Sequence, residues 1–128
     1  MENLKIGTEG YLEKIVEYKD TAVSYGSGLI EVFATPAMIG LIEMTAQLSV
    51  ERLLPEGHTT VGTEVNIKHI KATPIGEKVY AKTVLLEMDG KKLVFEVSAF
   101  DNKAQIGSGT HTRYIIHKER FMEKIKSL

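Results

Sequence analysis

The sequence predicts an α+β fold in which one antiparallel β-sheet wraps around a single long helix. First, residues 32–55 form a stretch that is long enough for a helix and apolar on most of its circumference. Second, alternating strand patterns surround it, one before at 10–18 and four after at 59–73, 78–88, 91–101 and 105–117. Third, Asp89-Gly90 joins two of these patterns as a tight hairpin, so neighbouring strands are expected to be antiparallel.

The two ends of the central helix carry recognisable signals. Thr35 is expected to be the N-cap and Pro36 the first helical residue, because a threonine hydroxyl accepts from a free N–H and proline already has a helical φ. Pro55 and Gly57 are expected to stop the helix. Between these signals the apolar residues leave only a narrow polar line, so the helix is expected to be covered on several sides.

That polar line consists of Gly40, Glu43, Gln47 and Glu51, whose spacing places them on one face. One interpretation is that the line is the solvated edge of a core helix, since carboxylates are mostly exposed. The other starts from Gly40, which costs about 1 kcal/mol relative to alanine in a helix interior. A glycine one turn before Glu43 would leave a notch through which a ligand could reach the carboxylate.

The remaining segments complete the predicted order. Residues 21–25 are expected to continue the first strand or pair with it, and Gly26-Ser27-Gly28 then breaks the pattern before the helix. Residues 118–128 are expected to form a short amphipathic helix. In the strand at 59–73 one face is expected to carry Val61, Thr63, Val65, Ile67 and His69.

Composition narrows the classes of function. The 128 residues suit a single domain, 1–128, and a net charge of −1 gives no general signature of nucleic-acid or membrane binding. The chain has no cysteine, which excludes disulfides and thiolate chemistry and fits a cytoplasmic location. The first residues contain no pattern of a signal peptide, so none is expected. No metal site is expected, because His111 and His117 would lie about 20 Å apart along one strand.

Two side chains remain as candidates for chemistry. Glu43 on the helix and His69 on the next strand could act together as a nucleophile or a general base, because burial and pairing tune the pKa of both groups towards neutral pH. His69 could equally be a hydrogen-bonded structural histidine. Thr35 could supply a hydrogen bond to a carbonyl oxygen, but eight residues of regular helix rise about 12 Å. Substrate or a second subunit would therefore have to bridge Thr35 and Glu43.

Four segments carry a resemblance to a known family: EVFATPAMIGLIE at 31–43, TVGTEVNIKHIKATPIG at 60–76, DGKKLVFEVSAFD at 89–101 and IGSGTHTRYIIHKERF at 106–121. In this order the chain resembles the hot-dog-fold acyl-CoA thioesterases, and most closely the fluoroacetyl-CoA thioesterase-like branch. The resemblance implies that Thr35, Glu43 and His69 form the catalytic group. By this resemblance, the carboxylate attacks the thioester or activates water. The imidazole transfers protons, and the hydroxyl supplies a supporting hydrogen bond.

The resemblance also implies substrate contacts and an assembly. Gly62 matches a glycine beside the substrate, Arg113 is a further candidate, and Phe33 and Gly40 complete the expected substrate-binding residues. A homodimer, or a tetramer, is implied, with coenzyme A near the subunit interface. No cofactor is expected, because coenzyme A is part of the substrate. The segment 25–33 is shorter and poorer in aromatic residues than in the branch that acts on fluoroacetyl-CoA, so a different acyl group is expected.

Three functions follow as hypotheses. The first is hydrolysis of a small acyl-CoA thioester to the free acid and coenzyme A. The alternative is a non-catalytic acyl-CoA-binding or regulatory module, which would bind such ligands tightly without turnover. The third is hydration of an enoyl thioester, which is ranked last because the matched residues are those of the hydrolase branch.

Overall fold

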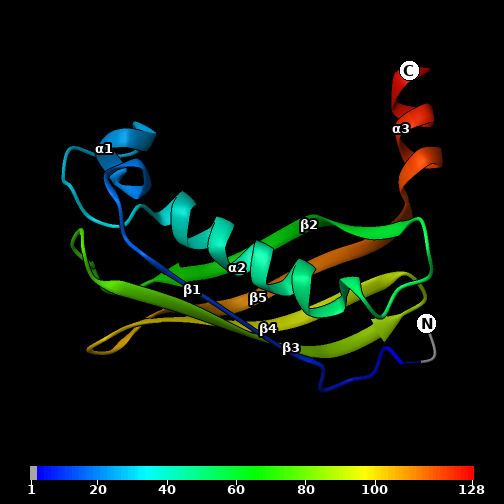
Figure 1. Cartoon of the computed structure of the whole chain (residues 1–128), viewed down its shortest axis with the longest axis horizontal. Helices are drawn as coiled ribbons and strands as arrows, with labels where there is room; N and C mark the ends of the chain where they lie inside the picture. Colours follow the sequence, from blue (N-terminus) through cyan, green and yellow to red (C-terminus); the bar gives the residue numbers. More distant parts are fainter. Residues whose placement is uncertain (1–2) are drawn as a thin grey trace.

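The computed structural model describes residues 3–128 and confirms the predicted α+β fold (Figure 1). The elements follow in the order β1 (Glu9–Ile15), the 3-10 helix η1 (Tyr18–Asp20), α1 (Ala22–Tyr25), α2 (Thr35–Glu51), β2 (His58–His69), β3 (Lys78–Asp89), β4 (Lys92–Asp101), β5 (Gln105–His117) and α3 (Lys118–Lys126). Among the described residues, no helix combines the length and the apolar character needed to cross a bilayer.

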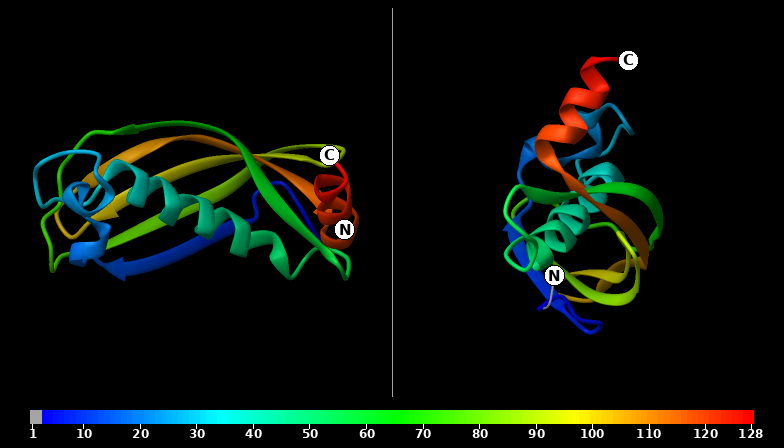
Figure 2. Two further views of the ribbon diagram at one scale, coloured as in Figure 1. Left: turned by 90° about the horizontal axis from the view of Figure 1, so that it is seen from above. Right: turned by 90° about the vertical axis from the view of Figure 1, so that its right-hand side faces the viewer.

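The five strands form one antiparallel sheet in the order β1-β3-β4-β5-β2. Strands β3, β4 and β5 form a meander. The predicted hairpin connects β3 to β4, with Asp89 opposite Lys92 and Gly90 at a φ of 61°. Strands β1 and β2 lie at opposite edges, although they flank α2 in sequence. The sheet curls around α2, which is clearest in the end-on view (Figure 2).

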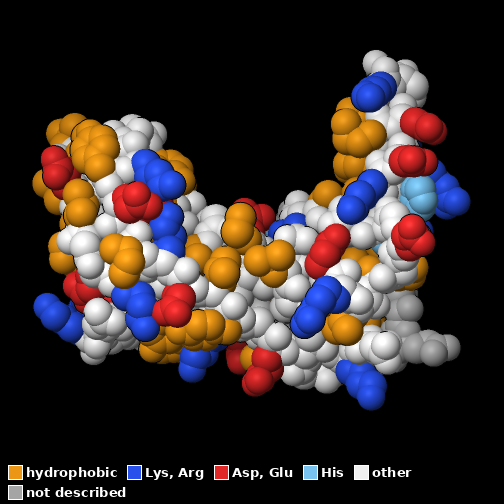
Figure 3. Space-filling view, in the orientation of Figure 1, with side chains coloured by type: hydrophobic (Ala, Val, Ile, Leu, Met, Phe, Trp, Pro, Cys, Tyr) orange, Lys and Arg blue, Asp and Glu red, His pale blue; other side chains and the backbone are white. Residues whose placement is uncertain are grey.

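The core lies between α2 and the concave face of the sheet. The helix buries one side, which consists of Ala37, Met38, Leu41, Ile42, Thr45, Ala46 and Val50. The opposite side is open, since Met44 and Leu48 are 56% and 50% exposed. The prediction that the helix is covered on several sides is therefore wrong for this face. It forms the floor of a broad depression between the α1 end and the projecting helix α3 (Figure 3).

Both predicted ends of the central helix need correction. The N-cap is Ala34, and Thr35 and Pro36 are the first two helical residues. Proline fits there because the first turn needs no intrahelical donor. The helix ends at Glu51, before the predicted stop, since Leu53 and the following residue make tighter backbone bonds to Val50 and Glu51. A residue before proline disfavours the helical conformation, so the chain leaves the helix ahead of Pro55.

The segment after β1 also differs from the prediction. The strand ends at Ile15, and residues 21–25 do not continue it. Thr21 makes a single bridge to Phe33, and its hydroxyl accepts from the Ser24 N–H to begin the short helix α1. Gly26, with a φ of 73°, ends this helix. A threonine can cap a helix as readily as extend a strand, and the local pattern does not decide between them.

Strand β2 contains a β-bulge, and the residues that face inwards are even-numbered before it and odd-numbered after it. Gly62 is opposite Arg113 and Glu64 is opposite Thr112, so Thr63 is the extra residue. Before the bulge the even-numbered Gly62 faces α2, and after it the odd-numbered Ile67 and His69 face the core side. The predicted single row from Val61 to His69 is therefore wrong. The strand also ends at His69, short of the predicted Thr73.

Candidate active site

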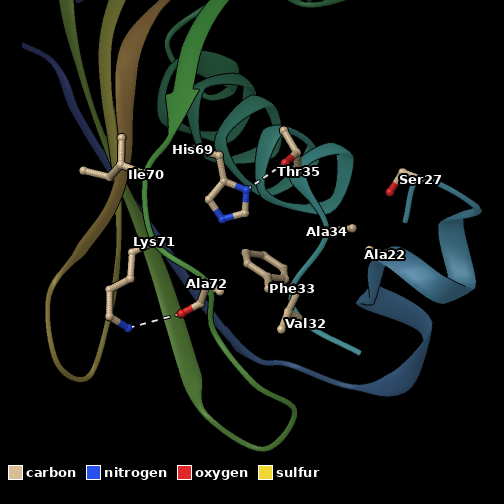
Figure 4. A pocket seen from close by; sticks show the side chains of 10 residues that line it. All are labelled: Ala22, Ser27, Val32, Phe33, Ala34, Thr35, His69, Ile70, Lys71 and Ala72. Atoms are coloured by element: carbon tan, nitrogen blue, oxygen red, sulfur yellow. Dashed lines mark hydrogen bonds between the residues drawn. The ribbon is translucent and has the colours of Figure 1, made fainter. Parts of the chain in front are cut away.

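One part of the candidate site joins the start of α2 to the end of β2. Thr35 Oγ1 and His69 Nδ1 lie 2.8 Å apart, within hydrogen-bond distance. Thr35 is the first residue of α2, and His69 is the last residue of β2. The close-up in Figure 4 shows the imidazole beside Thr35, with the ring of Phe33 next to it.

These residues line a hollow of about 400 Å³. Its wall is mostly apolar and consists of Ala22, Ser27, Val32, Phe33, Ala34, Thr35, His69, Ile70, Lys71 and Ala72. Phe33 itself is buried, and its N–H donates to the Thr73 carbonyl at 2.8 Å. The segment before the helix is thereby fixed to the segment after β2, and both form the wall of one hollow.

The electrostatic setting of His69 favours the neutral imidazole. Burial is the larger influence and lowers the pKa of His69, whereas the nearby Lys71 backbone acts in the opposite direction. Its Nε2 atom is buried and has no hydrogen-bond partner among residues 3–128. A buried nitrogen without a partner is costly, so this atom indicates a place for a further polar group.

Glu43 lies in a second group, about two helical turns further along α2. Its Oε2 is 3.7 Å from Arg113 Nη1 and 3.8 Å from His111 Nε2. Gly62 lies directly below, since a Cβ at that position would be 2.5 Å from Glu43 Oε2. The absence of a side chain at residue 62 is therefore what lets the carboxylate approach β2.

Arg113 is held in place by a network of hydrogen bonds on the inner face of the sheet. Its Nε donates to Thr60 Oγ1 at 2.7 Å, its Nη2 donates to the Thr60 carbonyl at 2.9 Å, and its Nη1 is 3.1 Å from His111 Nε2. His111 Nδ1 in turn lies 2.8 Å from the Glu64 carbonyl oxygen. Both side chains are buried, whereas the Glu43 side chain is 39% exposed.

Gly40 is exposed on α2, one turn before Glu43. It lines an open hollow of about 270 Å³ with Glu43, Met44, Gln47 and Arg113. A Cβ at Gly40 would have no neighbouring atom within 4 Å, so the space beside the carboxylate is open.

Within the chain these two groups stay apart. The hollow with Thr35 and His69 and the hollow with Glu43 have no lining residue in common. Helix α2 is continuous between Thr35 and Glu43, which separates them by about 12 Å. The structure brings Thr35 to His69 and Arg113 to Glu43, but it does not bring Glu43 to His69.

Sequence reasoning missed His111. It considered this residue only as a metal ligand together with His117. The His117 side chain caps α3 by accepting a hydrogen bond from the Arg120 N–H. The available signal was the alternation in β5, which places His111 and Arg113 on the same face as Gly107 and Gly109. Two polar side chains on an inward face need partners from the helix that covers them.

The comparisons with known proteins identify the family. The model for the fluoroacetyl-CoA-specific thioesterases matches residues 16–119. The chain belongs to this family. A relative, the fluoroacetyl-CoA thioesterase of Streptantibioticus cattleyicolor, is 40% identical over 96 residues, which are 75% of this chain and 69% of the relative. The resemblance inferred from the four sequence segments is thereby confirmed.

Solved structures support the same family and fold. The fluoroacetyl-CoA thioesterase FlK matches with a TM-score of 0.91 and 32% identity, covering 98% of this chain and 97% of that one. A variant of it in complex with fluoroacetate and CoA gives a TM-score of 0.86 and 33% identity, covering 92% and 99%. A hot-dog-like protein from Thermanaerovibrio acidaminovorans gives 0.89 at 21% identity, covering 98% and 93%, and shows the shared fold alone.

Proposed function

We propose that this family member hydrolyses the thioester of a small acyl-CoA, which gives the free acid and coenzyme A. The observation that carries the proposal is the Thr35–His69 contact at the edge of an apolar hollow, which leaves His69 Nε2 buried and without a partner in the described chain. Family membership supports the reaction class. No cofactor is required, because coenzyme A arrives as part of the substrate.

His69 is the proposed general base and acid. If its Nδ1–H donates to Thr35 Oγ1, then Nε2 keeps its lone pair on the side of the hollow. Nε2 takes a proton from water as the water oxygen bonds to the carbonyl carbon. It then returns a proton to sulfur as the carbon–sulfur bond breaks. The lowered pKa of His69 keeps the imidazole unprotonated and ready to act near neutral pH.

Glu43 is the proposed carboxylate of the reaction, acting on the carbonyl carbon directly or through the attacking water. Direct attack forms an acyl-glutamate anhydride and releases the thiol, and water then cleaves the anhydride. Activation of water needs the carboxylate to accept a hydrogen bond from it. Both routes require Glu43 close to a thioester bound beside His69, which a single protomer does not provide.

A second copy of the chain supplies the missing proximity in this proposal. Strand β2 is at the edge of the sheet, and the residues in its middle, Glu64, Val65 and Asn66, are all exposed. Antiparallel pairing of two β2 strands about a two-fold axis between Val65 and Asn66 would place His69 opposite Gly62 of the second copy. Because the bulge turns both residues to the inner face, Glu43 of the second copy would then adjoin His69.

The hollow supports a short acyl group. Its volume of about 400 Å³ also has to admit the thioester and part of the pantetheine arm of coenzyme A, and Phe33, Val32 and Ile70 make its wall apolar. Gly62 and Arg113 line the Glu43 side and would face the same substrate from the second copy. Fluoroacetyl-CoA is the substrate named for the relatives, and the short segment 25–33 supports a different acyl group here.

Thiol release from a panel of acyl-CoA substrates tests the reaction. We expect turnover of at least one short-chain substrate and its loss in Glu43→Gln and in His69→Asn, with both variants folded by circular dichroism. Tight acyl-CoA binding with no release of thiol across the panel would contradict hydrolysis and support the binding module.

Mixing the two inactive variants tests the shared site. After dissociation and reassociation, about a quarter of wild-type activity should return, because half of the dimers are mixed and each mixed dimer has one intact site. No recovery, with mixed dimers demonstrated by mass spectrometry, would show that Glu43 and His69 act within one protomer.

A further inference from the structure

The contacts of His111 determine which of its ring nitrogens carries the proton. Nδ1 lies 2.8 Å from the Glu64 carbonyl oxygen, which can only accept, so Nδ1 must be the donor. Nε2 lies 3.1 Å from Arg113 Nη1, which can only donate, so Nε2 must be the acceptor. Both contacts are satisfied together only by the neutral imidazole protonated on Nδ1. The side chain is fully buried, so water does not offer an alternative partner.

Arg113 depends on that acceptor for its orientation. Two of its nitrogens, Nε and Nη2, donate to Thr60, and Nη1 is the one that turns towards α2. One N–H of Nη1 can donate to His111 Nε2, and Glu43 Oε2 lies 3.7 Å from the same nitrogen, within ion-pair distance. The planar guanidinium is thereby fixed at three points, and the cation that faces Glu43 cannot rotate away.

We propose that His111 is a positioning residue that acts as a neutral hydrogen-bond acceptor, holding Arg113 so that its charge orients the Glu43 carboxylate. The proposal rests on the proposed role of Glu43 in thioester hydrolysis. His111 acts through Arg113, since its own Nε2 is 3.8 Å from Glu43 Oε2 and has no proton to donate.

The surroundings of His111 maintain the neutral form. Burial lowers the pKa of His111, and the charge of Arg113 lowers it further, whereas the Glu64 carbonyl and the Glu43 carboxylate act in the opposite direction. The groups that face the ring are Arg113 from β5, Glu43 from α2, the Glu64 carbonyl from β2 and the Phe95 ring from β4, whose centroid is 6.5 Å away. A protonated ring would place two cations and two donors against each other and release Arg113.

Two substitutions separate the two hydrogen bonds of His111. In His111→Gln the amide oxygen can reach the position of Nε2 and accept from Arg113. In His111→Asn the shorter amide can reach only the position of Nδ1 and donate to the Glu64 carbonyl. Both introduce a buried amide of similar polarity, so thermal melting of the pair controls for stability.

We expect His111→Asn to lower kcat about 100-fold with KM changed less than about threefold, because a misplaced Glu43 affects the reacting geometry more than binding. His111→Gln should recover most of the lost kcat. Equal losses in both variants, or a loss confined to KM, would overturn the positioning role.

Nitrogen-15 NMR of the wild-type imidazole tests the proton assignment independently of activity. We expect Nδ1 to be protonated and Nε2 unprotonated at pH 7, and Arg113→Gln to shift the Nε2 resonance. A proton on Nε2 would overturn the inference, even if neither histidine variant folds.

If the wild type released no thiol from any acyl-CoA, the proposed function would fail while the NMR result still tested the His111–Arg113 contact. If the wild type were active and His111→Asn kept its kcat, only this inference would fail.

Discussion

Gly62→Ala offers a sharp test, because it changes the position of one carboxylate without straining the backbone. Gly62 is not among the glycines with positive φ, so alanine can adopt its conformation. The new Cβ would lie 2.5 Å from Glu43 Oε2, 3.1 Å from His111 Cε1 and 3.2 Å from Arg113 Nη1. Since ordinary contacts are about 3.5 Å or longer, the nearest group has to move by about 1 Å.

Glu43 is the group that yields. His111 and Arg113 are buried and fixed by hydrogen bonds, whereas the Glu43 side chain is 39% exposed and has rotatable bonds that let it swing outwards. A displacement of this size costs about 100-fold in rate when the displaced group takes part in the reaction. The free energy of unfolding should change by less than about 1 kcal/mol, since the methyl group is accommodated at a partly exposed side chain.

The assay is thiol release with the best acyl-CoA substrate, together with urea unfolding. As a control, Gly62→Ala is also made in a Glu43→Ala background, where the shortest of the three contacts is absent and only those with His111 and Arg113 remain. The stability cost of the methyl group should be smaller there than in the wild type. A Gly62→Ala protein with normal kcat would refute the reasoning, because it would show that the carboxylate is not needed at this position.

Four further predictions follow from the described contacts. Thr35→Val should lower kcat about tenfold while the urea midpoint stays near the wild-type value, since it removes only the hydroxyl that contacts His69. Asp101→Asn should reduce the free energy of unfolding by about 2 kcal/mol in urea titrations, because the buried carboxylate accepts from a lysine, a threonine and two turn N–H groups. Gly109→Ala should cost about 3 kcal/mol in the same assay, since its Cβ would lie 2.0 Å from a carbonyl oxygen of β2. Burial lowers the pKa of His69 and His111, so the unfolded chain binds more protons than the folded chain at mildly acidic pH. The free energy of unfolding in urea should therefore decline as the pH falls below 6.5, and the decline should be smaller in His111→Gln.

The elements that local chemistry determines could be predicted from the sequence. Asp89-Gly90 specifies a tight turn without help from the rest of the chain, and the predicted bounds of β5 agree with the structure. The bulge at Thr63 could not be predicted, because the extra residue is a threonine, which is common in regular strands and needs no special φ. One unmarked residue was therefore enough to reverse the inward face of β2.

The candidate site was predictable in its residues more than in its arrangement. The resemblance supplied Thr35, Glu43 and His69, and helix geometry alone indicated that the first two are too far apart to touch. Which group the Thr35 hydroxyl would contact depends on where β2 ends, which no local pattern encodes. The role of His111 was hidden for a related reason, since two of its partners, the Glu64 carbonyl and the Glu43 carboxylate, come from another strand and a helix.

The strand order has a consequence for how the protein folds. The meander of β3, β4 and β5 needs only short loops to form. The edge strands β1 and β2 must close much longer loops to pair with their neighbours, at a larger entropic cost. We therefore expect the nucleus to lie in the meander, with the edge carrying His69 joining after the rate-limiting step. Changes at that edge should accelerate unfolding and leave the refolding rate almost unchanged, so the strand that carries His69 can vary in sequence without slowing folding.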